Sequence, residues 1–499
     1  MEVAMILGVA VVAVTALLTF SSFFNKWYYE PVLKPGQPPL PPGSLGWPVF
    51  GNMAAFLRAF KSGRPDTFMA HYVAKLGTVA VFSRLSNRRF FLVSRYNRVG
   101  FYKAFLFWQP TVLAATPEAC KFVLSKDSFE TGWPESAVEL MGRNSFAGLT
   151  GESHFKLRKL TEPAVNSPKA LEQYVPLIVN NIKACLARWS AQDKIVLLTE
   201  MRRFTFLTVL HILYGKDSSL DVDETFSLYY IVNQGIRALP INFPGTAYNK
   251  ALKARRKLIK LIQDVINQRR ASGKPQETNI LSLLMDQLDD KGEALEDAQI
   301  IDVLNMYMNA GHDSTAHVIM WLMIFLKRNP DVLEKVKTEQ DGIAKCISEG
   351  EMLNLSDIKR MRYLSSVVDE TLRLANISPM VFRRALVDVE FNGFTIPKGW
   401  HAEAWLRQVH MDPHVHPDPE KFDPERWEKY GASPFTFMPF GMGNRTCPGN
   451  ELAKLQIFIV VHYFVTGYRW TALNPNSKVS YLPHPRPRDF YSVRVSKLL

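Results

Sequence analysis

The pattern of apolar and polar positions predicts one helix of membrane-spanning length at the start of the chain. Residues 3–24 carry no charge and consist mainly of Val, Ala, Leu, Ile and Phe. About twenty such residues cross the hydrocarbon core of a bilayer. A cleaved signal peptide would begin with a positive region, whereas Met1-Glu2 precedes this run. The first cations, Lys26 and Lys34, follow the run, so the rest of the chain is expected on the cytosolic side.

A proline-rich stretch follows, and no comparable linker or charge block interrupts the remaining sequence. Residues 35–43 read Pro-Gly-Gln-Pro-Pro-Leu-Pro-Pro-Gly, which predicts a stiff, extended spacer. A length of 499 residues alone would allow two or three domains. Because no second linker divides the sequence after residue 43, we expect one large domain at 44–499. A transmembrane anchor at residues 1–25 and a hinge at 26–43 precede it.

Two patterns farther along predict the class of fold. From about Asp297 to Arg328 a long apolar run predicts a helix, which an Asn-Pro pair then stops. Residues 389–391 and 394–396 flank an Asn-Gly pair, the sequence signature of a hairpin with a type I′ turn. The expected fold is mainly α with a small β region.

A cysteine near the C-terminus lies in a loop punctuated by glycines. The loop carries the pattern Phe-x-x-Gly-x-Arg-x-Cys-x-Gly from Phe440 to residue 449. Pro448 suits the first position of a helix, so Cys447 is expected at a helix N-terminus, which favours a thiolate. Arg445 is a planar cation that suits a carboxylate. A lone cysteine is most often an inert buried thiol, but a chance match to five positions is improbable.

This loop resembles the haem-binding loop of cytochrome P450 monooxygenases, in which a cysteine thiolate is the axial ligand of the iron. The resemblance implies one large haem-thiolate monooxygenase domain with haem b as cofactor. It also implies Cys447 as the iron ligand, with Phe440 and Arg445 in contact with the haem.

Residues 310–315, Ala-Gly-His-Asp-Ser-Thr, are similar to the oxygen-activating helix of the same family. A mid-helix glycine costs about 1 kcal/mol relative to alanine, and an unsatisfied aspartate costs more. The resemblance implies that Asp313 relays protons together with a hydroxyl of Ser314 or Thr315. Many members have threonine directly after the acid, where this chain has Ser314, so both hydroxyls remain candidates. We also expect these hydroxyls to open a local bulge; the alternative is that they bond their own helix, with Asp313 in a surface notch.

Three side chains outside the cysteine loop are implied as contacts of the haem propionates. His154 and Arg158 match a Trp-x-x-x-Arg helix of the family, with histidine in the tryptophan position. Arg383 lies in a second segment similar to a propionate contact. The alternative for the first pair is an ordinary surface helix.

The resemblance also implies a buried charge network of Glu370, Arg373 and Arg426, because a Pro-x-Arg segment accompanies a Glu-x-x-Arg helix. Buried charges are tolerable only when each is paired. Glu200 and Arg203 have the same spacing but lack the second segment, so they are expected to have no such role.

Charge and cysteine content narrow the class of protein. The net charge of +13 is dispersed along the chain, which argues against a nucleic-acid partner. The densest patch, residues 250–260, is expected to be a solvated helix face; contact with anionic lipid or an acidic redox partner is the alternative. The four cysteines show no Cys-x-x-Cys spacing, which argues against zinc and against a disulfide framework.

Segments spread along the chain are similar to the plant ent-kaurenoic acid oxidases, among them residues 41–62, 131–134, 240–245 and 447–454. The resemblance implies successive oxidation of ent-kaurenoic acid toward gibberellin, in a single-pass protein of the endoplasmic reticulum membrane. Electrons would come from an NADPH-dependent reductase on that membrane. Residues 75–94 depart from the family pattern and look inserted.

Two alternatives use the same haem loop. The first is oxidation of another plant terpenoid, triterpenoid or sterol, because fold and haem chemistry fix no substrate. The second is isomerisation or dehydration of an oxygenated lipid without a reductase; a relay at Asp313 argues against it. A haem sensor without enzymatic activity is a further alternative, outside the enzymes.

Overall fold

The computed structural model describes residues 24–47, 50–76, 99–272, 279–288, 292–348, 350–429, 431 and 433–498. The chain forms two compact units. Unit 1 comprises Met1–Gly132, Ser378–Pro417 and Pro434–Met438, and unit 2 comprises Trp133–Ile377, Asp418–Ser433 and Pro439–Leu499. The predicted anchor at 1–25 and the unusual segment at 75–94 lie almost wholly outside the described residues. In the part that is described, every helix is too short or too polar to cross a bilayer.

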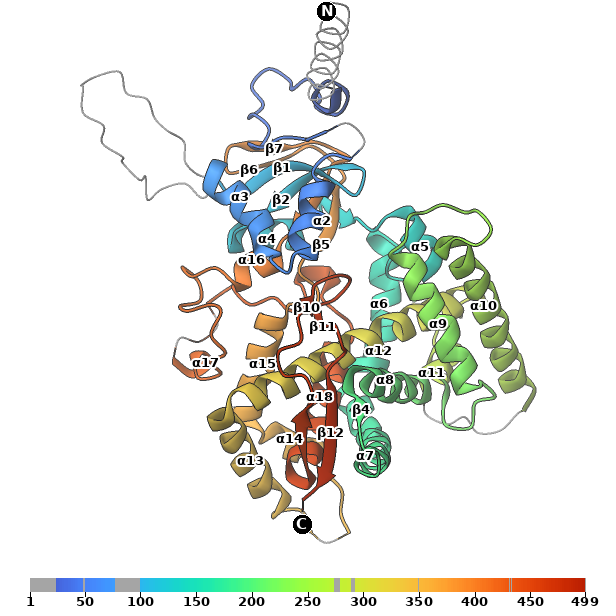
Figure 1. Cartoon of the computed structure of the whole chain (residues 1–499). Coiled ribbons are helices and arrows are strands. Elements are labelled where there is room, and N and C mark those ends of the chain that lie inside the picture. Colours follow the sequence, from blue (N-terminus) through green and yellow to red (C-terminus); the bar gives the residue numbers. More distant parts are fainter. Residues whose placement is uncertain are drawn as a thin grey trace, which may run out of the picture. The chain divides into compact units, whose positions relative to one another are not determined.

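Unit 1 is built on a five-stranded sheet (Figure 1). The strand order is β1-β2-β8-β5-β3, with β2 and β8 parallel and the other neighbours antiparallel. The strands of this sheet are β1 (Phe101–Leu106), β2 (Gln109–Ala114), β3 (Phe129–Thr131), β5 (Val381–Ala385) and β8 (His401–Ala404). Helices of the unit include α2 (Met53–Lys61), α3 (Asp66–Leu76), α4 (Pro117–Ser125) and α16 (Leu406–His410).

The hairpin predicted from the Asn-Gly pair is confirmed. It consists of β6 (Val389–Phe391) and β7 (Phe394–Ile396), paired antiparallel. Asn392 has φ +48° and Gly393 has φ +75°, the two positive angles that a type I′ turn requires.

The proline-rich stretch is hydrogen-bonded to unit 1. Thr395 donates its backbone N–H to the Pro39 carbonyl at 2.9 Å and its hydroxyl to the Pro38 carbonyl at 2.7 Å. Lys103 of the edge strand β1 donates its N–H to the Pro42 carbonyl at 2.9 Å. Residues 38–42 therefore lie against β1 and β7.

Unit 2 is mainly helical, as the sequence predicts. Its longest helix, α12, runs from Asp297 to Arg328 and ends at the Asn-Pro stop. The other helices are α5 (Glu135–Met141), α6 (Gly151–Asn166), α7 (Pro168–Ser190), α8 (Leu197–Tyr214), α9 (Val222–Ile236), α10 (Ala247–Ser272), α11 (Ile280–Asp286), α13 (Pro330–Ala344), α14 (Leu355–Lys359), α15 (Arg362–Ala375), α17 (Arg426–Lys429) and α18 (Asn450–Gly467). Small antiparallel pairings join β4 (Ile195–Val196), β12 (Ser492–Lys497) and β9 (Tyr468–Ala472), and join β10 (Val479–Ser480) with β11 (Arg486–Pro487).

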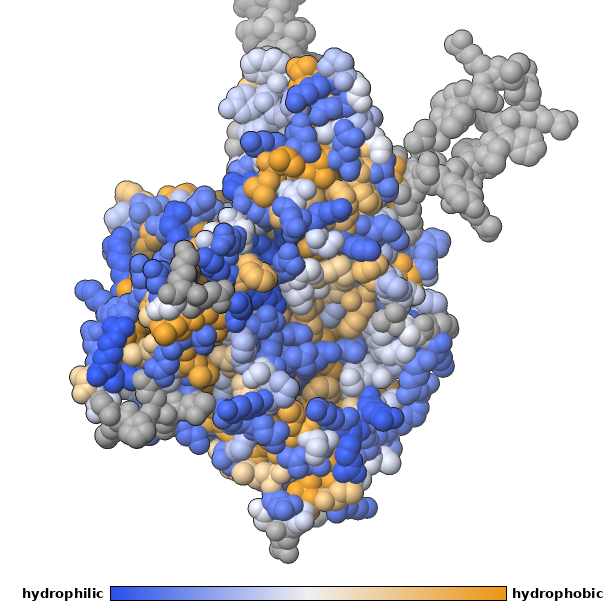
Figure 2. Space-filling view, turned by 180° about the vertical axis from the view of Figure 1, so that it is seen from behind, coloured by the Kyte–Doolittle hydropathy of each residue, from blue (hydrophilic) through white to orange (hydrophobic). Residues whose placement is uncertain are grey.

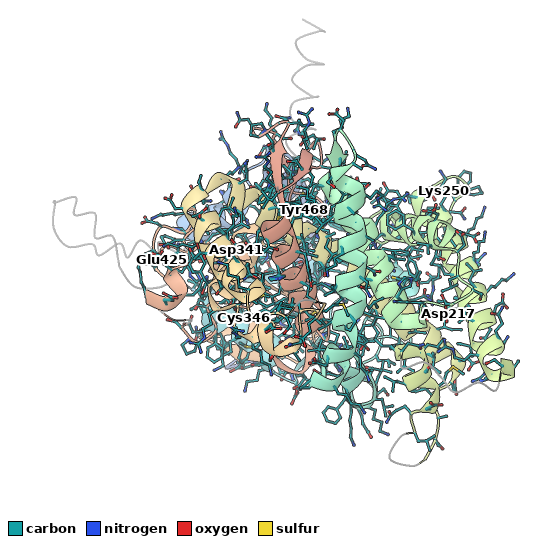
Figure 3. All side chains as sticks on the ribbon, turned by 90° about the horizontal axis from the view of Figure 1, so that it is seen from below. Asp217, Lys250, Asp341, Cys346, Glu425 and Tyr468 are labelled. Carbon is teal, nitrogen blue, oxygen red and sulfur yellow. The ribbon has the colours of Figure 1, made fainter. Side chains whose placement is uncertain are left out.

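The basic patch at residues 250–260 lies on α10, and most of its cations are exposed. Lys250 lies on the outer side of the ribbon in Figure 3. Leu252 and Leu258 are buried on the opposite face. Hydrophilic and hydrophobic residues are interspersed over the face of the molecule seen in Figure 2. The expectation of a solvated helix face is confirmed, with one exception: Arg255 points inward and pairs with Asp302 at 2.6 Å.

Candidate active site

The cysteine loop is held in shape by its own backbone. Cys447 donates its N–H to the Phe440 carbonyl at 2.9 Å, and Gly443, with φ +72°, begins a short 3₁₀ turn, η1 (Gly443–Arg445). The helix after the loop starts later than the sequence suggests. Its N-cap is Gly449 and its first residue is Asn450, so Pro448 lies before the helix, not at its first position. The Pro-Gly pair forms a turn that places the thiol just ahead of the helix N-terminus.

Three influences act on the Cys447 thiol. Burial raises its pKa, while a hydrogen bond from the Gly449 N–H and the positive charge of Arg158 act in the opposite direction. A ligand that brought its own positive charge to the sulfur would favour the thiolate.

The residues around Cys447 fit a flat iron-containing cofactor. Side chains added at Gly441 or Gly449 would meet no atom within 4 Å, so open space borders the loop on the side of these glycines. The donor is a thiol that accepts a backbone N–H bond, as the sulfur ligands of haem proteins do. Thiol, open space and nearby cations therefore suit haem.

Two arginines tie the loop to neighbouring helices. Arg158 on α6 forms a two-pronged pair with Glu162 at 2.9 and 3.1 Å and donates to the Thr446 carbonyl at 2.6 Å. Arg445 donates to the carbonyls of Phe146 and Leu149 at 3.2 and 2.9 Å. Both guanidinium groups thus bond to the protein itself as well as lying near the thiol loop.

The other two predicted propionate contacts are buried. His154 lies on α6, one turn before Arg158, and its ring meets Phe146 edge-on at 5.8 Å between centroids. Its side chain is buried, although its neighbours on α6, Phe155 and Lys156, are exposed. Arg383 lies on β5 of unit 1 and donates to the Phe382 carbonyl at 3.0 Å.

The segment at 310–315 occupies the one open stretch in the middle of α12. Ala310 is exposed, while Gly311 and Ser314 are half-buried. Ser314 donates its hydroxyl to the Ala310 carbonyl at 2.8 Å, and Thr315 donates to the Gly311 carbonyl at 3.1 Å. The expected bulge is absent from this helix, because α12 is α-helical throughout and both hydroxyls bond within it.

Asp313 does not lie in a surface notch but at the centre of a charged cluster. Arg202 of α8 donates to one carboxylate oxygen at 2.6 Å, and Arg237, the residue after α9, approaches the other at 3.4 Å. His317 and His484 lie 3.4 and 3.8 Å from the carboxylate. The side chain of Asp313 is only 9% exposed.

The burial of this cluster determines its charge state. Burial lowers the pKa of His317 to about 3 and that of His484 to about 4, so both imidazoles are neutral at neutral pH. Burial alone would raise the pKa of Asp313, but its interactions with His317 and with the cationic Arg202 hold that pKa well below its usual value. At neutral pH an ionised Asp313 therefore faces cationic arginines.

The predicted network of Glu370, Arg373 and Arg426 is confirmed. Arg373 binds both oxygens of Glu370 at 2.8 and 2.9 Å, and Arg426 donates to one of them at 3.1 Å. Glu370 and Arg373 are completely buried. Remaining donors of Arg373 bind the carbonyls of Pro419 and Lys421.

Sequence reasoning missed the partners of Asp313. Arg202 belongs to the Glu200–Arg203 segment that was expected to have no role, and Glu200 binds Arg188 and Trp189 instead of Arg203. Arg237 and His484 lie 76 and 171 positions from Asp313, so no local spacing points to them. The only local signal was the high cost of an aspartate in an apolar helix.

Comparisons with known proteins identify the family of this chain. The Cytochrome P450 family profile matches residues 76–485. Ent-kaurenoic acid oxidase 1 of Hordeum vulgare is 44% identical over 98% of this chain and 97% of its own length. The 7,8-epoxymelianol synthase of Ailanthus altissima is 40% identical over 99% and 97%. The structure of a retinoic acid-bound cyanobacterial protein, CYP120A1, superposes with a TM-score of 0.79 at 28% identity, covering 93% of this chain and all of that one.

A thiol loop that fits haem, a helix with an open Ala-Gly-x-x-Ser stretch and a buried Glu-Arg-Arg network thus occur in a chain that matches one family over most of its length. The chain belongs to the cytochrome P450 family and is a haem-dependent monooxygenase.

Proposed function

We propose that this protein oxidises ent-kaurenoic acid in successive steps toward gibberellin. The observation that carries the proposal is identity of 42–44% to ent-kaurenoic acid oxidases of Hordeum vulgare and Arabidopsis thaliana over at least 94% of both chains. Retinoic acid, named with the similar cyanobacterial structure, is likewise an apolar hydrocarbon that ends in a carboxylate.

In this proposal the thiolate of Cys447 would hold the haem iron. Bound haem supplies the chemistry that activates dioxygen, with electrons from a redox partner. Phe440 and Arg445 belong to the same loop, and His154, Arg158 and Arg383 bind the propionates. Each of these arginines is a fixed cation, which suits the recognition of a carboxylate.

The same proposal assigns proton delivery to the open stretch of α12. Ser314 is a better candidate than Thr315, because Ser314 is half-buried beside exposed Ala310 whereas Thr315 is 3% exposed. Asp313 lies on the buried side of the helix, where Arg202 and Arg237 keep its carboxylate ionised. Ser314 holds the proton at its Oγ, and the negative charge of the neighbouring Asp313 carboxylate orients this hydroxyl.

We further propose that residues 1–25 anchor the protein in the endoplasmic reticulum membrane and that residues 26–43 join this anchor to the catalytic domain at 44–499. An NADPH-dependent reductase in the same membrane would be the electron donor. The apolar composition of residues 3–24 supports this part of the proposal.

The decisive experiment is incubation of the full-length, haem-loaded protein with ent-kaurenoic acid, reductase and NADPH. We expect the hydroxy acid and then the ring-contracted aldehyde as transient products before the gibberellin. A single hydroxylated end product at saturating reductase would contradict successive oxidation. Turnover that needs no NADPH would instead favour an isomerase or dehydratase.

Replacing the thiol tests the haem assignment itself. Cys447→Ser should abolish the thiolate-type absorption of the reduced carbon monoxide complex, because a serine oxygen is a poor iron ligand. Cys185→Ser is the matched control, since that thiol is buried on α7. If Cys447→Ser kept both the spectrum and the activity, the assignment of the ligand would be wrong.

A second candidate function is oxidation of a triterpenoid. The 7,8-epoxymelianol synthases of Ailanthus altissima and Citrus sinensis are 40% identical to this chain, close to the identity of the ent-kaurenoic acid oxidases. Offering both substrates to the same preparation distinguishes the two candidates by which one yields product.

A further inference from the structure

The cluster around Asp313 carries more positive charge than its own carboxylate can balance. Arg202 and Arg237 contact Asp313, and Arg486 of β11 lies close enough for all three charges to influence its pKa. With both imidazoles neutral, three guanidinium groups face one carboxylate. The cluster therefore has a formal excess of two positive charges.

The arginine side chains that carry this excess charge are only partly exposed to solvent. The side chains of Arg202 and Arg237 are 19% and 28% exposed. Burial lowers the pKa of Arg237, and the like charge of Arg202 adds to that effect. An additional anion would offset both the burial of the Arg237 charge and its repulsion by Arg202.

The arginines retain donors for such an anion. Among the hydrogen bonds of the described residues, Arg202 uses only its Nε, which binds Asp313. Arg237 uses only one Nη, which is shared between a long contact of 3.4 Å to Asp313 and a contact of 2.9 Å to His484 Nε2. Both side chains are partly exposed, and the described residues make no hydrogen bond to the remaining Nη groups. They can bind both oxygens of a carboxylate, because a guanidinium group presents its N–H donors as a planar fork.

The cluster borders an aromatic ring and adjoins the open stretch of α12. The guanidinium carbons of Arg202 and Arg486 lie 6.0 and 5.4 Å from the centre of the Phe490 ring. His484 is fixed by a contact of 2.9 Å between its Nδ1 and the Ile377 carbonyl. Asp313 itself directly precedes Ser314, the half-buried residue of the open stretch.

We propose that Arg237, supported by Arg202 and His484, binds the carboxylate of the substrate and so selects an apolar acid over a neutral terpenoid. The inference rests on the proposed function and adds the group that recognises the substrate. A neutral ligand would cover these donors without pairing them, and unpaired buried donors are costly. The excess charge therefore favours a diterpenoid acid over an uncharged triterpenoid.

The test compares the binding of an acid with that of its neutral ester. Dissociation constants of ent-kaurenoic acid and of its methyl ester are measured by calorimetry on the full-length, haem-loaded protein. We expect Arg237→Gln to weaken binding of the acid by about 10- to 100-fold, the loss expected for a charge-assisted hydrogen bond, and to change binding of the ester by less than about twofold. Arg203→Gln is the control, because Arg203 lies next to Arg202 on α8 but is 55% exposed and pairs with Asp223.

A conservative variant guards against loss of folding. Arg237→Lys keeps the charge but lacks the fork, so it should weaken binding of the acid by less than Arg237→Gln and leave the ester unchanged. Equal weakening of acid and ester in either variant, or an unchanged affinity for the acid in Arg237→Gln, would overturn the inference while leaving the proposed function intact. If the parent protein bound only the ester, both this inference and the proposed function would be wrong.

Discussion

Two glutamates of this protein are equally buried and have opposite surroundings. Glu370 in unit 2 and Glu403 in unit 1 are both 0% exposed. Glu370 accepts bonds from Arg373, from Arg426 and from the backbone N–H of Asp423. The oxygens of Glu403 make no hydrogen bond of normal geometry with the described residues; burial raises the pKa of Glu403 to about 8, and the nearby indole N–H of Trp405 offsets this rise only in part. Burial alone does not decide whether a carboxyl is ionised; the donors around it do.

The largest loss of stability is expected when a member of the buried Glu370 network is replaced. Glu370→Ala should cost about 3–5 kcal/mol, because it leaves Arg373 buried without its carboxylate. We expect most of the protein to fail to retain haem, as measured by haem content and chemical unfolding. Glu425→Ala, which removes the surface pairs with Lys335 and Lys429, should change the stability far less. A haem-loaded Glu370→Ala protein of normal stability would disprove the structural role of the network.

Removing the buried carboxyl of Glu403 should raise the free energy of unfolding, by an amount that depends on pH. The folded-state pKa of Glu403 is raised from 4.5 to about 8, so its contribution to stability is full below pH 4.5 and is lost as the pH rises toward 8. Glu403→Gln should therefore be more stable than the parent, by an amount that grows by about 1.4 kcal/mol per pH unit between about pH 5 and 8. Unfolding by urea at several pH values measures this gain, with the exposed Glu390→Gln as control. A difference between variant and parent that does not change with pH would show that Glu403 has another partner.

A third glutamate lies between these extremes. Glu200 is 19% exposed and accepts bonds from Arg188 at 2.7 Å and from the indole N–H of fully buried Trp189 at 2.5 Å. Glu200→Ala should cost about 1–3 kcal/mol, because the indole N–H then has no acceptor. Glu200→Gln keeps an oxygen and should recover most of the loss in thermal unfolding. An Ala variant as stable as the parent would mean that water replaces the carboxylate.

The same contrast separates what the sequence could predict from what it could not. The Glu370 network was predictable because its members belong to two short motifs, and α12 and the β6–β7 hairpin were predictable because periodicity and an Asn-Gly turn are local signals. The start of α18 was misplaced because Pro448 suits either a helix or a turn. The partners of Asp313 and the burial of Glu403 depend on packing between distant segments, which no local pattern encodes.

The hydrogen bonds of the proline-rich stretch bear on how far the chain can be shortened at its N-terminus. β1 is the outermost strand of its sheet, and Gly43 bridges to Lys103 on that strand. A side chain at Gly43, which has φ +138°, would overlap the Lys103 backbone, so the approach is too close for any residue but glycine. A protein trimmed to begin at residue 44 would expose this strand edge, and exposed edges recruit other chains. Trimming to residue 24 keeps the edge covered, so solubility, more than activity, sets the limit for truncation.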